Sequence, residues 1–93
     1  MINFLPISLQ PERVYERDVV GKESEKRIQL QPKDGYVLFG HFGFLPTDGQ
    51  PHKVFLTRMI PTVMGDSLEL YFYNSEQNPV EIEVFSWQIK KPV

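Results

Sequence analysis

The 93-residue chain contains no cysteine and no alanine. Without cysteine there is no disulfide, no thiolate nucleophile and no cysteine-based zinc site, so packing alone must hold the fold. Alanine is the strongest helix former, whereas the chain has 12 aromatic residues, nine valines and six isoleucines, which suit strands. The length fits one core. We therefore expect one β domain over residues 1–93, with residues 1–12 able to form an extended arm.

The chain also lacks a charge excess and a long hydrophobic run. Ten basic residues face twelve acidic ones, for a net charge of −2. A strong binder of phosphate backbones normally carries a basic excess, so nucleic acid is not a favoured partner. No apolar stretch approaches the ~20 residues that span a bilayer. The apolar start has no basic residues and is broken at Pro6, unlike a signal peptide. We expect cytoplasmic synthesis, with a virion as one destination, and no membrane partner.

Eight prolines and six glycines divide the chain into strand-length segments. Turn residues lie at 33–35, 47–51, 65–66 and 74–79. Residues 67–73 alternate, with Leu68, Leu70 and Phe72 on one side and Tyr71 and Tyr73 on the other. The alternation resumes at 80–84, which predicts a hairpin around the 74–79 turn.

Two further segments carry unusual patterns. From residue 85 the apolar set changes parity, at Phe85, Trp87 and Ile89, which predicts a β-bulge or a sheet corner near residues 84–86. Residues 36–45 are apolar on both parities, so either both faces of this strand are covered or one face meets a partner.

Shorter strands are expected at 13–20, 27–31 and 53–60, although Pro11 also permits a helix start before the first. Six or seven short strands joined by short turns need antiparallel neighbours. The predicted fold is therefore a small antiparallel β-sandwich, jelly-roll-like or Ig-like. A five-stranded OB-type barrel is the alternative.

The sequence offers no catalytic constellation. His41 and His52 are not accompanied by a nucleophile elbow, and no phosphate-binding glycine motif occurs. Asp34, Asp48 and Asp66 each adjoin a glycine and could converge on calcium, but Asp-Gly pairs are also ordinary turn residues. We predict no enzyme activity, no catalytic or metal-binding residue and no cofactor.

One segment carries a resemblance. His41-Phe-Gly-Phe-Leu45, followed by Asp48-Gly49 and Val54-Phe-Leu56, resembles in degenerate form the two RNA-binding strands of cold-shock domains. Gly40 stands at the lysine of that pattern and Thr57 at its final histidine. The resemblance implies that Phe42, Phe44 and Phe55 stack the bases of a single strand.

Surplus aromatic surface points to a contact role. Tyrosine and tryptophan are enriched at protein interfaces because they bury much area and keep one polar end. We predict a structural or assembly protein that self-associates or docks on a larger assembly, by analogy an accessory protein of a phage capsid or tail. The alternatives are a single-stranded nucleic-acid-binding domain and a carbohydrate-binding sandwich. The predicted interface residues are Tyr36, Phe39, Phe42, Phe44, Tyr71, Tyr73 and Trp87.

Overall fold

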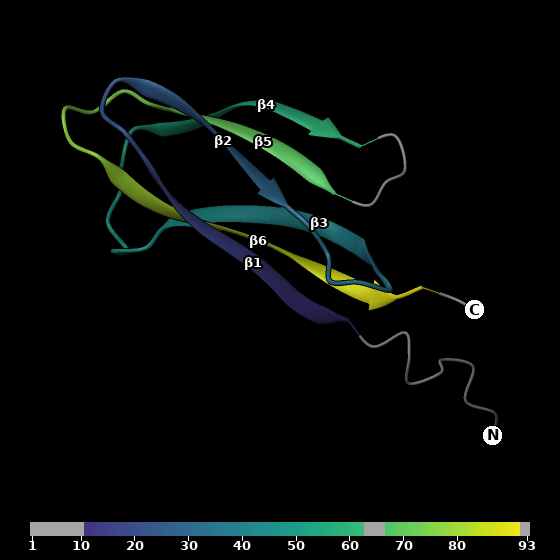
Figure 1. Ribbon diagram of the computed structural model, residues 1–93. Coiled ribbons are helices and arrows are strands. Elements are labelled where there is room, and N and C mark those ends of the chain that lie inside the picture. Colours follow the sequence, from purple (N-terminus) through teal and green to yellow (C-terminus); the bar gives the residue numbers. More distant parts are fainter. Residues whose placement is uncertain (1–10, 63–66, 92–93) are drawn as a thin grey trace.

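The computed structural model describes residues 11–62 and 67–91, which form an all-β fold (Figure 1). Six strands are divided between two layers. In chain order they are β1 (Glu12–Val20), β2 (Ser24–Leu30), β3 (Tyr36–Pro46), β4 (Val54–Pro61), β5 (Leu68–Asn74) and β6 (Val80–Lys90). The strands expected near 13–20, 27–31, 36–45 and 53–60 are all confirmed, and the helical reading of the first is wrong. Within the described ranges, no helix is long and apolar enough to cross a membrane.

The strands form two separate three-stranded sheets with the orders β1-β6-β3 and β2-β5-β4. Every neighbouring pair is antiparallel, as the short connections require. The described residues form no closed barrel, so the expectation of two antiparallel layers is confirmed and the OB-type alternative is wrong.

The core lies between the sheets. It is built from alternate residues of each strand, chiefly aliphatic side chains around Phe72, which is fully buried. Phe44 of β3 packs edge-on against Phe72 of β5, with 4.8 Å between ring centroids. This contact joins the two layers. The even-numbered residues of β6 from Val80 to Gln88 are all buried, so its odd-numbered residues lie on the outer face of their sheet.

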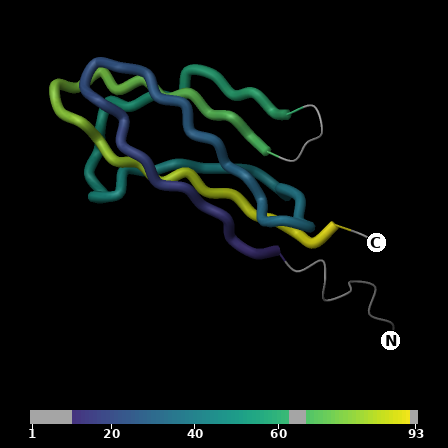
Figure 2. The backbone as a smooth tube through the Cα atoms, in the orientation of Figure 1, coloured from purple at the N-terminus to yellow at the C-terminus, as the bar shows by residue number. Residues whose placement is uncertain are grey.

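The predicted hairpin between residues 67–73 and 80–84 is wrong. These segments are β5 and β6, which are the central strands of different sheets, and the chain crosses between layers after Asn74 (Figure 2). The Asn74 side chain is fully buried there. Its amide donates to the carbonyls of Val20 and Asn78, and its Oδ1 accepts from the amide of Glu76. The crossover differs from a hairpin because each of the two strands finds its neighbours in a separate sheet.

The predicted change of phase near residue 85 is also wrong. Val80, Ile82 and Val84 face the core, and the buried polar residues Ser86 and Gln88 continue the same inward set. The register shift lies instead in the neighbouring strand, between Phe39 and Gly43 of β3. Gly40 has a φ of 82° at this irregularity, a conformation that favours glycine. The odd-numbered apolar residues of β6 therefore face outward.

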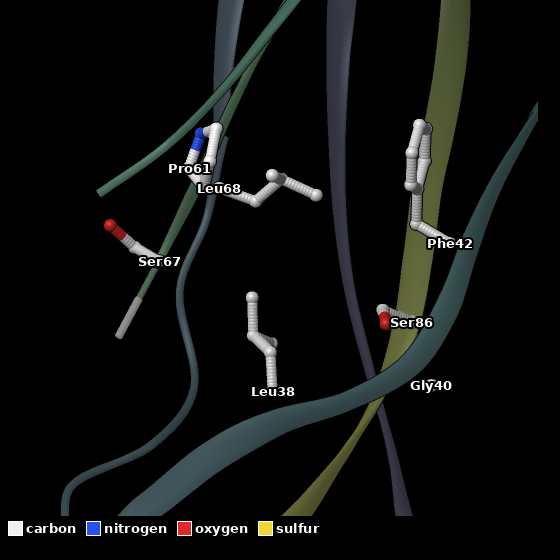
Figure 3. Close-up of a pocket in the computed structure, with 7 residues that line it drawn as sticks. All are labelled: Leu38, Gly40, Phe42, Pro61, Ser67, Leu68 and Ser86. Carbon is white, nitrogen blue, oxygen red and sulfur yellow. The ribbon is translucent and has the colours of Figure 1, made fainter. Parts of the chain in front are cut away.

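A pocket of about 180 Å³ lies between the two sheets (Figure 3). The side chains of Leu38 and Leu68 project into this space from opposite layers. Its walls also include Gly40, Phe42, Pro61, Ser67 and Ser86. No charged side chain is among these residues, so the pocket offers apolar walls and two hydroxyls.

Two sequence expectations fall on residues outside the described ranges. These are most of the 1–12 arm and the turn at 65–66, including Asp66 as a calcium candidate. The turns predicted at 33–35 and 47–51 are present, and Gly35 and Gly49 have φ angles of 84° and 73°.

Candidate protein interaction surface

The outer face of the β1-β6-β3 sheet carries several exposed apolar and aromatic side chains, and we call it the aromatic face. Residues that lie opposite one another in antiparallel strands share a face, which fixes its membership. The rows across β1, β6 and β3 are Arg13, Trp87 and Phe39; Tyr15, Phe85 and Gly43; and Arg17, Glu83 and Leu45. Val19 with Glu81, and Ile89 with Val37, extend the rows at the two ends.

No element within residues 11–62 and 67–91 covers this face. Tyr15 is 54% exposed, Phe39 50% and Trp87 38%, and Val19 and Leu45 are also exposed. Isolated apolar residues are common on protein surfaces, but a contiguous apolar patch marks a site of interaction. Here the register places these residues in adjacent rows of one sheet. The outward-facing Phe39 and Leu45 are therefore exposed, so the described chain does not cover both faces of the 36–45 strand; that its outer face meets a partner stays a prediction.

Two glycines of β3 shape the face. A Cβ built on Gly43 would lie 2.7 Å from Cζ of Phe85, so the Phe85 ring occupies the place of a side chain at Gly43. A Cβ on Gly40 would lie 3.9 Å from Cδ1 of Trp87. The Arg13 guanidinium lies 4.9 Å from the centre of the Phe85 ring. Phe85 thus packs down onto the sheet, whereas Trp87 and Phe39 stand beside it with exposed surface.

A charge cluster lies within the same face. Arg13 and Arg17 of β1 both donate to the Glu83 carboxylate of β6, Arg17 Nε at 2.8 Å from Oε1. The Glu83 side chain is only 10% exposed, although it lies on an outer face. The hydrogen bond to Glu83 raises the pKa of Arg17. The carboxylate holds both guanidinium groups close to the sheet, and with Glu81 it brings the formal charge of the face to zero.

The predicted interface residues are divided among four places. Phe39 and Trp87 are cross-strand neighbours on the aromatic face. Phe42 and Phe44 pack against the core. Tyr71 and Tyr73 lie on the outer face of the other sheet, opposite the buried Phe72 side, where Arg58 lies 4.1 Å from the Tyr71 ring centre. Tyr36 begins β3, with the Lys33 ammonium 4.2 Å from its ring centre.

The structure does not assemble the platform implied by the cold-shock resemblance. Phe42 and Phe44 are partly buried between the layers, whereas Phe55 is 54% exposed on β4. Strands β3 and β4 belong to different sheets. The three rings therefore share no surface on which consecutive bases could stack.

Sequence reasoning missed Tyr15, Val19, Leu45 and Phe85 as members of the aromatic face. The signal was present, because Arg13, Tyr15 and Arg17 alternate in β1 and Phe85, Trp87 and Ile89 alternate in β6. It was overlooked because an apolar parity was assigned to the core. In the second half of β6 the buried residues are the polar Ser86 and Gln88, so the apolar residues there lie on the outer face and not in the core.

A second polar cluster ties two loops together. His52 Nε2 lies 2.8 Å from Oδ2 of Asp48, and its Nδ1 lies 3.0 Å from Oε1 of Glu76. The hydrogen bond to Glu76 contributes most to raising the pKa of His52, and the hydrogen bond to Asp48 contributes next. The imidazole in turn lowers the pKa of Glu76. Both ring nitrogens are engaged by carboxylates. In the described part of the chain, no group of three or more such side chains is arranged to hold a metal ion.

The chain was compared with protein-family models, with curated proteins and with solved structures, and none of the three comparisons gave a match.

Proposed function

We propose that this protein is a non-enzymatic assembly module that self-associates or docks on a larger protein assembly through the aromatic face. The exposed rings of Tyr15, Phe39 and Trp87 beside the charge-neutral Arg13 and Arg17 cluster carry this proposal. Aromatic residues and arginine are the types enriched in the buried centres of interfaces, and lysine and glutamate are depleted there. An accessory role in a phage capsid or tail, and hence a virion location, is one setting in which such a module functions.

The finer architecture that we propose is jelly-roll-like. The pairs β1·β6 and β2·β5 form a two-stranded ribbon that passes from one sheet to the other. Strand β3 then pairs with β6 in the first sheet, and β4 pairs with β5 in the second. Every connection except β4–β5 passes from one sheet to the other. An Ig-like sandwich would instead join several consecutive strands within a sheet by hairpins. The strand order therefore supports the jelly roll over the Ig-like alternative.

A carbohydrate-binding sandwich is the second candidate. Trp87 and Phe39 lie side by side with exposed rings, and a sugar ring can stack on such a pair. A glycan array probed with the protein and with Trp87→Ser tests this reading, which predicts binding that the substitution removes. The nucleic-acid reading has weaker support, since Phe42 and Phe44 pack against the core while Phe55 is exposed on the other sheet, and the aromatic face has no net positive charge.

The native size of the protein in the cells that make it tests the assembly function. An extract is fractionated by size exclusion at low and high salt, and the chain is detected with an antibody. We expect elution well above the 10.9 kDa of the monomer at both salt concentrations, because apolar contacts survive salt. A Phe39→Ser chain should elute as a monomer, whereas Phe55→Ser, altered at an equally exposed ring on the other sheet, should not. Monomeric elution of the unaltered chain under both conditions would refute the assembly function.

A further inference from the structure

The register of the three strands shows that the aromatic face is nearly complementary to itself. On the middle row, the exposed Tyr15 of β1 lies on one side of Phe85, and Gly43 of β3, which has no side chain, lies on the other. On the next row, Arg13 and Phe39 flank Trp87 in the same way. These two rows thus carry a large or cationic group at the β1 edge and a glycine or an aromatic ring at the β3 edge.

A two-fold axis parallel to β6 turns this asymmetry into a fit. Such an axis places β6 over β6, and the β1 edge of each copy over the β3 edge of the other. At equal height along the strands, Tyr15 then meets the Phe85 ring of the other copy where that ring lies over Gly43, and Arg13 meets the exposed ring of Phe39. An arginine above an aromatic face is attractive, and so is the edge-on or offset contact of two aromatic rings.

The charge of the face also favours a second copy. Arg13 and Arg17 are held by Glu83, and the face as a whole carries no net charge with which to select a charged partner. The axis places Glu83 opposite the Glu83 of the other copy, but Arg13 and Arg17 already compensate each carboxylate, so two such faces bring no net repulsion when they meet. A strongly charged partner surface would find no excess of opposite charge on this face, so a neutral aromatic surface is the better match.

The size of the face is sufficient for a weak, specific contact between two copies. Three strands about 4.8 Å apart and 11 residues of roughly 3.3 Å rise give a face of about 500 Å² in projection. Two faces bury roughly 1,000 Å², near the lower limit of specific interfaces and in the range of weak, transient ones. The dimer is therefore expected to form and dissociate within ordinary working concentrations.

We propose that the occupant of the aromatic face is a second copy of this chain, packed sheet to sheet about a two-fold axis that runs along β6. This inference rests on the proposed assembly function and names its partner. Trp87 is the only tryptophan of the chain and lies at the centre of the contact, so its fluorescence reports the covering of the face.

The first experiment follows the purified chain from low to high micromolar concentration by light scattering and by acrylamide quenching of Trp87. We expect the mass to rise from 10.9 kDa to twice that value and the quenching of Trp87 to fall in parallel. Phe39→Ser should raise the dissociation constant at least about tenfold, because it removes the aromatic partner of Arg13 in both copies, and Phe55→Ser should leave it unchanged.

The second experiment tests the two-fold geometry through engineered cysteines. The chain has no cysteine of its own, so every disulfide formed comes from the introduced residues. Arg17 and Leu45 flank Glu83 at opposite edges of the face. Arg17→Cys and Leu45→Cys should form a disulfide-linked dimer when mixed, and much less when either is oxidised alone. Phe55→Cys, on the other sheet, should pair with neither.

The outcomes separate this inference from the assembly function. A purified chain that stays monomeric while the native chain elutes in a large complex overturns the second copy and retains the assembly. A dimer in which Trp87 remains fully quenchable, or in which Phe55→Cys cross-links as well as the mixed pair, shows contact through another surface and also overturns the proposal. A native chain that is itself monomeric refutes the assembly function.

Discussion

The buried side chain of Asn74 offers a sharp test of how the chain passes from one sheet to the other. Its amide nitrogen donates to the Val20 carbonyl at 3.1 Å and to the Asn78 carbonyl at 2.8 Å, and its oxygen accepts from the Glu76 amide at 2.8 Å. These three bonds join the end of β1, the end of β5 and the connection to β6. Two substitutions divide their contribution.

Asn74→Ala removes all three bonds. At about 0.5–1.5 kcal/mol for each, the free energy of unfolding should fall by about 2–4 kcal/mol. That is a large share of the roughly 5–14 kcal/mol expected for a domain of this size. Asn74→Asp keeps the acceptor for Glu76 but presents a carboxylate to two carbonyl oxygens. It should cost more than alanine at neutral pH, because the second oxygen of the buried carboxylate then faces two carbonyl oxygens and no donor.

The assay is urea unfolding followed by Trp87 fluorescence and circular dichroism, repeated between neutral pH and about pH 4. In the Asn74→Asp chain, burial and the two facing carbonyls disfavour the charged form of the introduced carboxyl. Its penalty should therefore diminish as the pH falls and the group gains a proton that it can donate. Asn78→Ala is the control, since the Asn78 backbone carbonyl remains. An Asn74→Ala loss below about 0.5 kcal/mol, or an Asn74→Asp chain as stable as the unaltered one at neutral pH, would refute the role assigned to this side chain.

Three further predictions concern the other clusters. Gly43→Ala should cost about 1 kcal/mol, because its Cβ displaces the Phe85 ring, and the cost should vanish in a Phe85→Ala background; equal costs in both backgrounds by urea unfolding would contradict this contact. Because the pKa of His52 is raised in the folded protein, its contribution to stability is present below about pH 6.5 and is lost as the pH rises through the folded value. The pKa values of Asp48 and Glu76 are lowered, so their contribution is present above about pH 4.5 and is lost on acidification. Melting temperatures measured from about pH 4 to about pH 9 should therefore be highest between these limits, and His52→Asn should flatten the alkaline side; an unaltered alkaline slope would contradict the cluster. Glu83→Gln leaves a net positive aromatic face, so its dimer should be weaker at low salt and recover as salt is added; light scattering that shows no salt dependence would contradict the charge argument.

Local patterns predicted most of the strands. The alternation of Leu68, Leu70 and Phe72 placed β5, and the apolar run from Tyr36 placed β3, because a strand with a buried face must repeat every two residues. The same patterns misplaced two features. A short turn between alternating segments predicted a hairpin at Asn74, and a second apolar parity predicted a bulge near Phe85.

The candidate surface was only partly predictable for the same reason. Phe39 and Trp87 were expected at a contact and do share the aromatic face, but Tyr15 and Phe85 were not named. Phe42 and Phe44, grouped with them by sequence, turn inward instead. Aromatic identity shows that a side chain has a large area to bury, and only its parity in a placed strand shows on which side.

Composition and periodicity determined by themselves that this chain is built of antiparallel strands, since residue preferences and the two-residue repeat act within each segment. Which strands pair, and therefore which apolar rows meet each other and which face water, was decided only by the tertiary structure. The physical reason is that one alternating pattern satisfies a hairpin and a crossover equally well. The choice between them depends on partners such as Val20 and Asn74, which lie 54 residues apart in the chain.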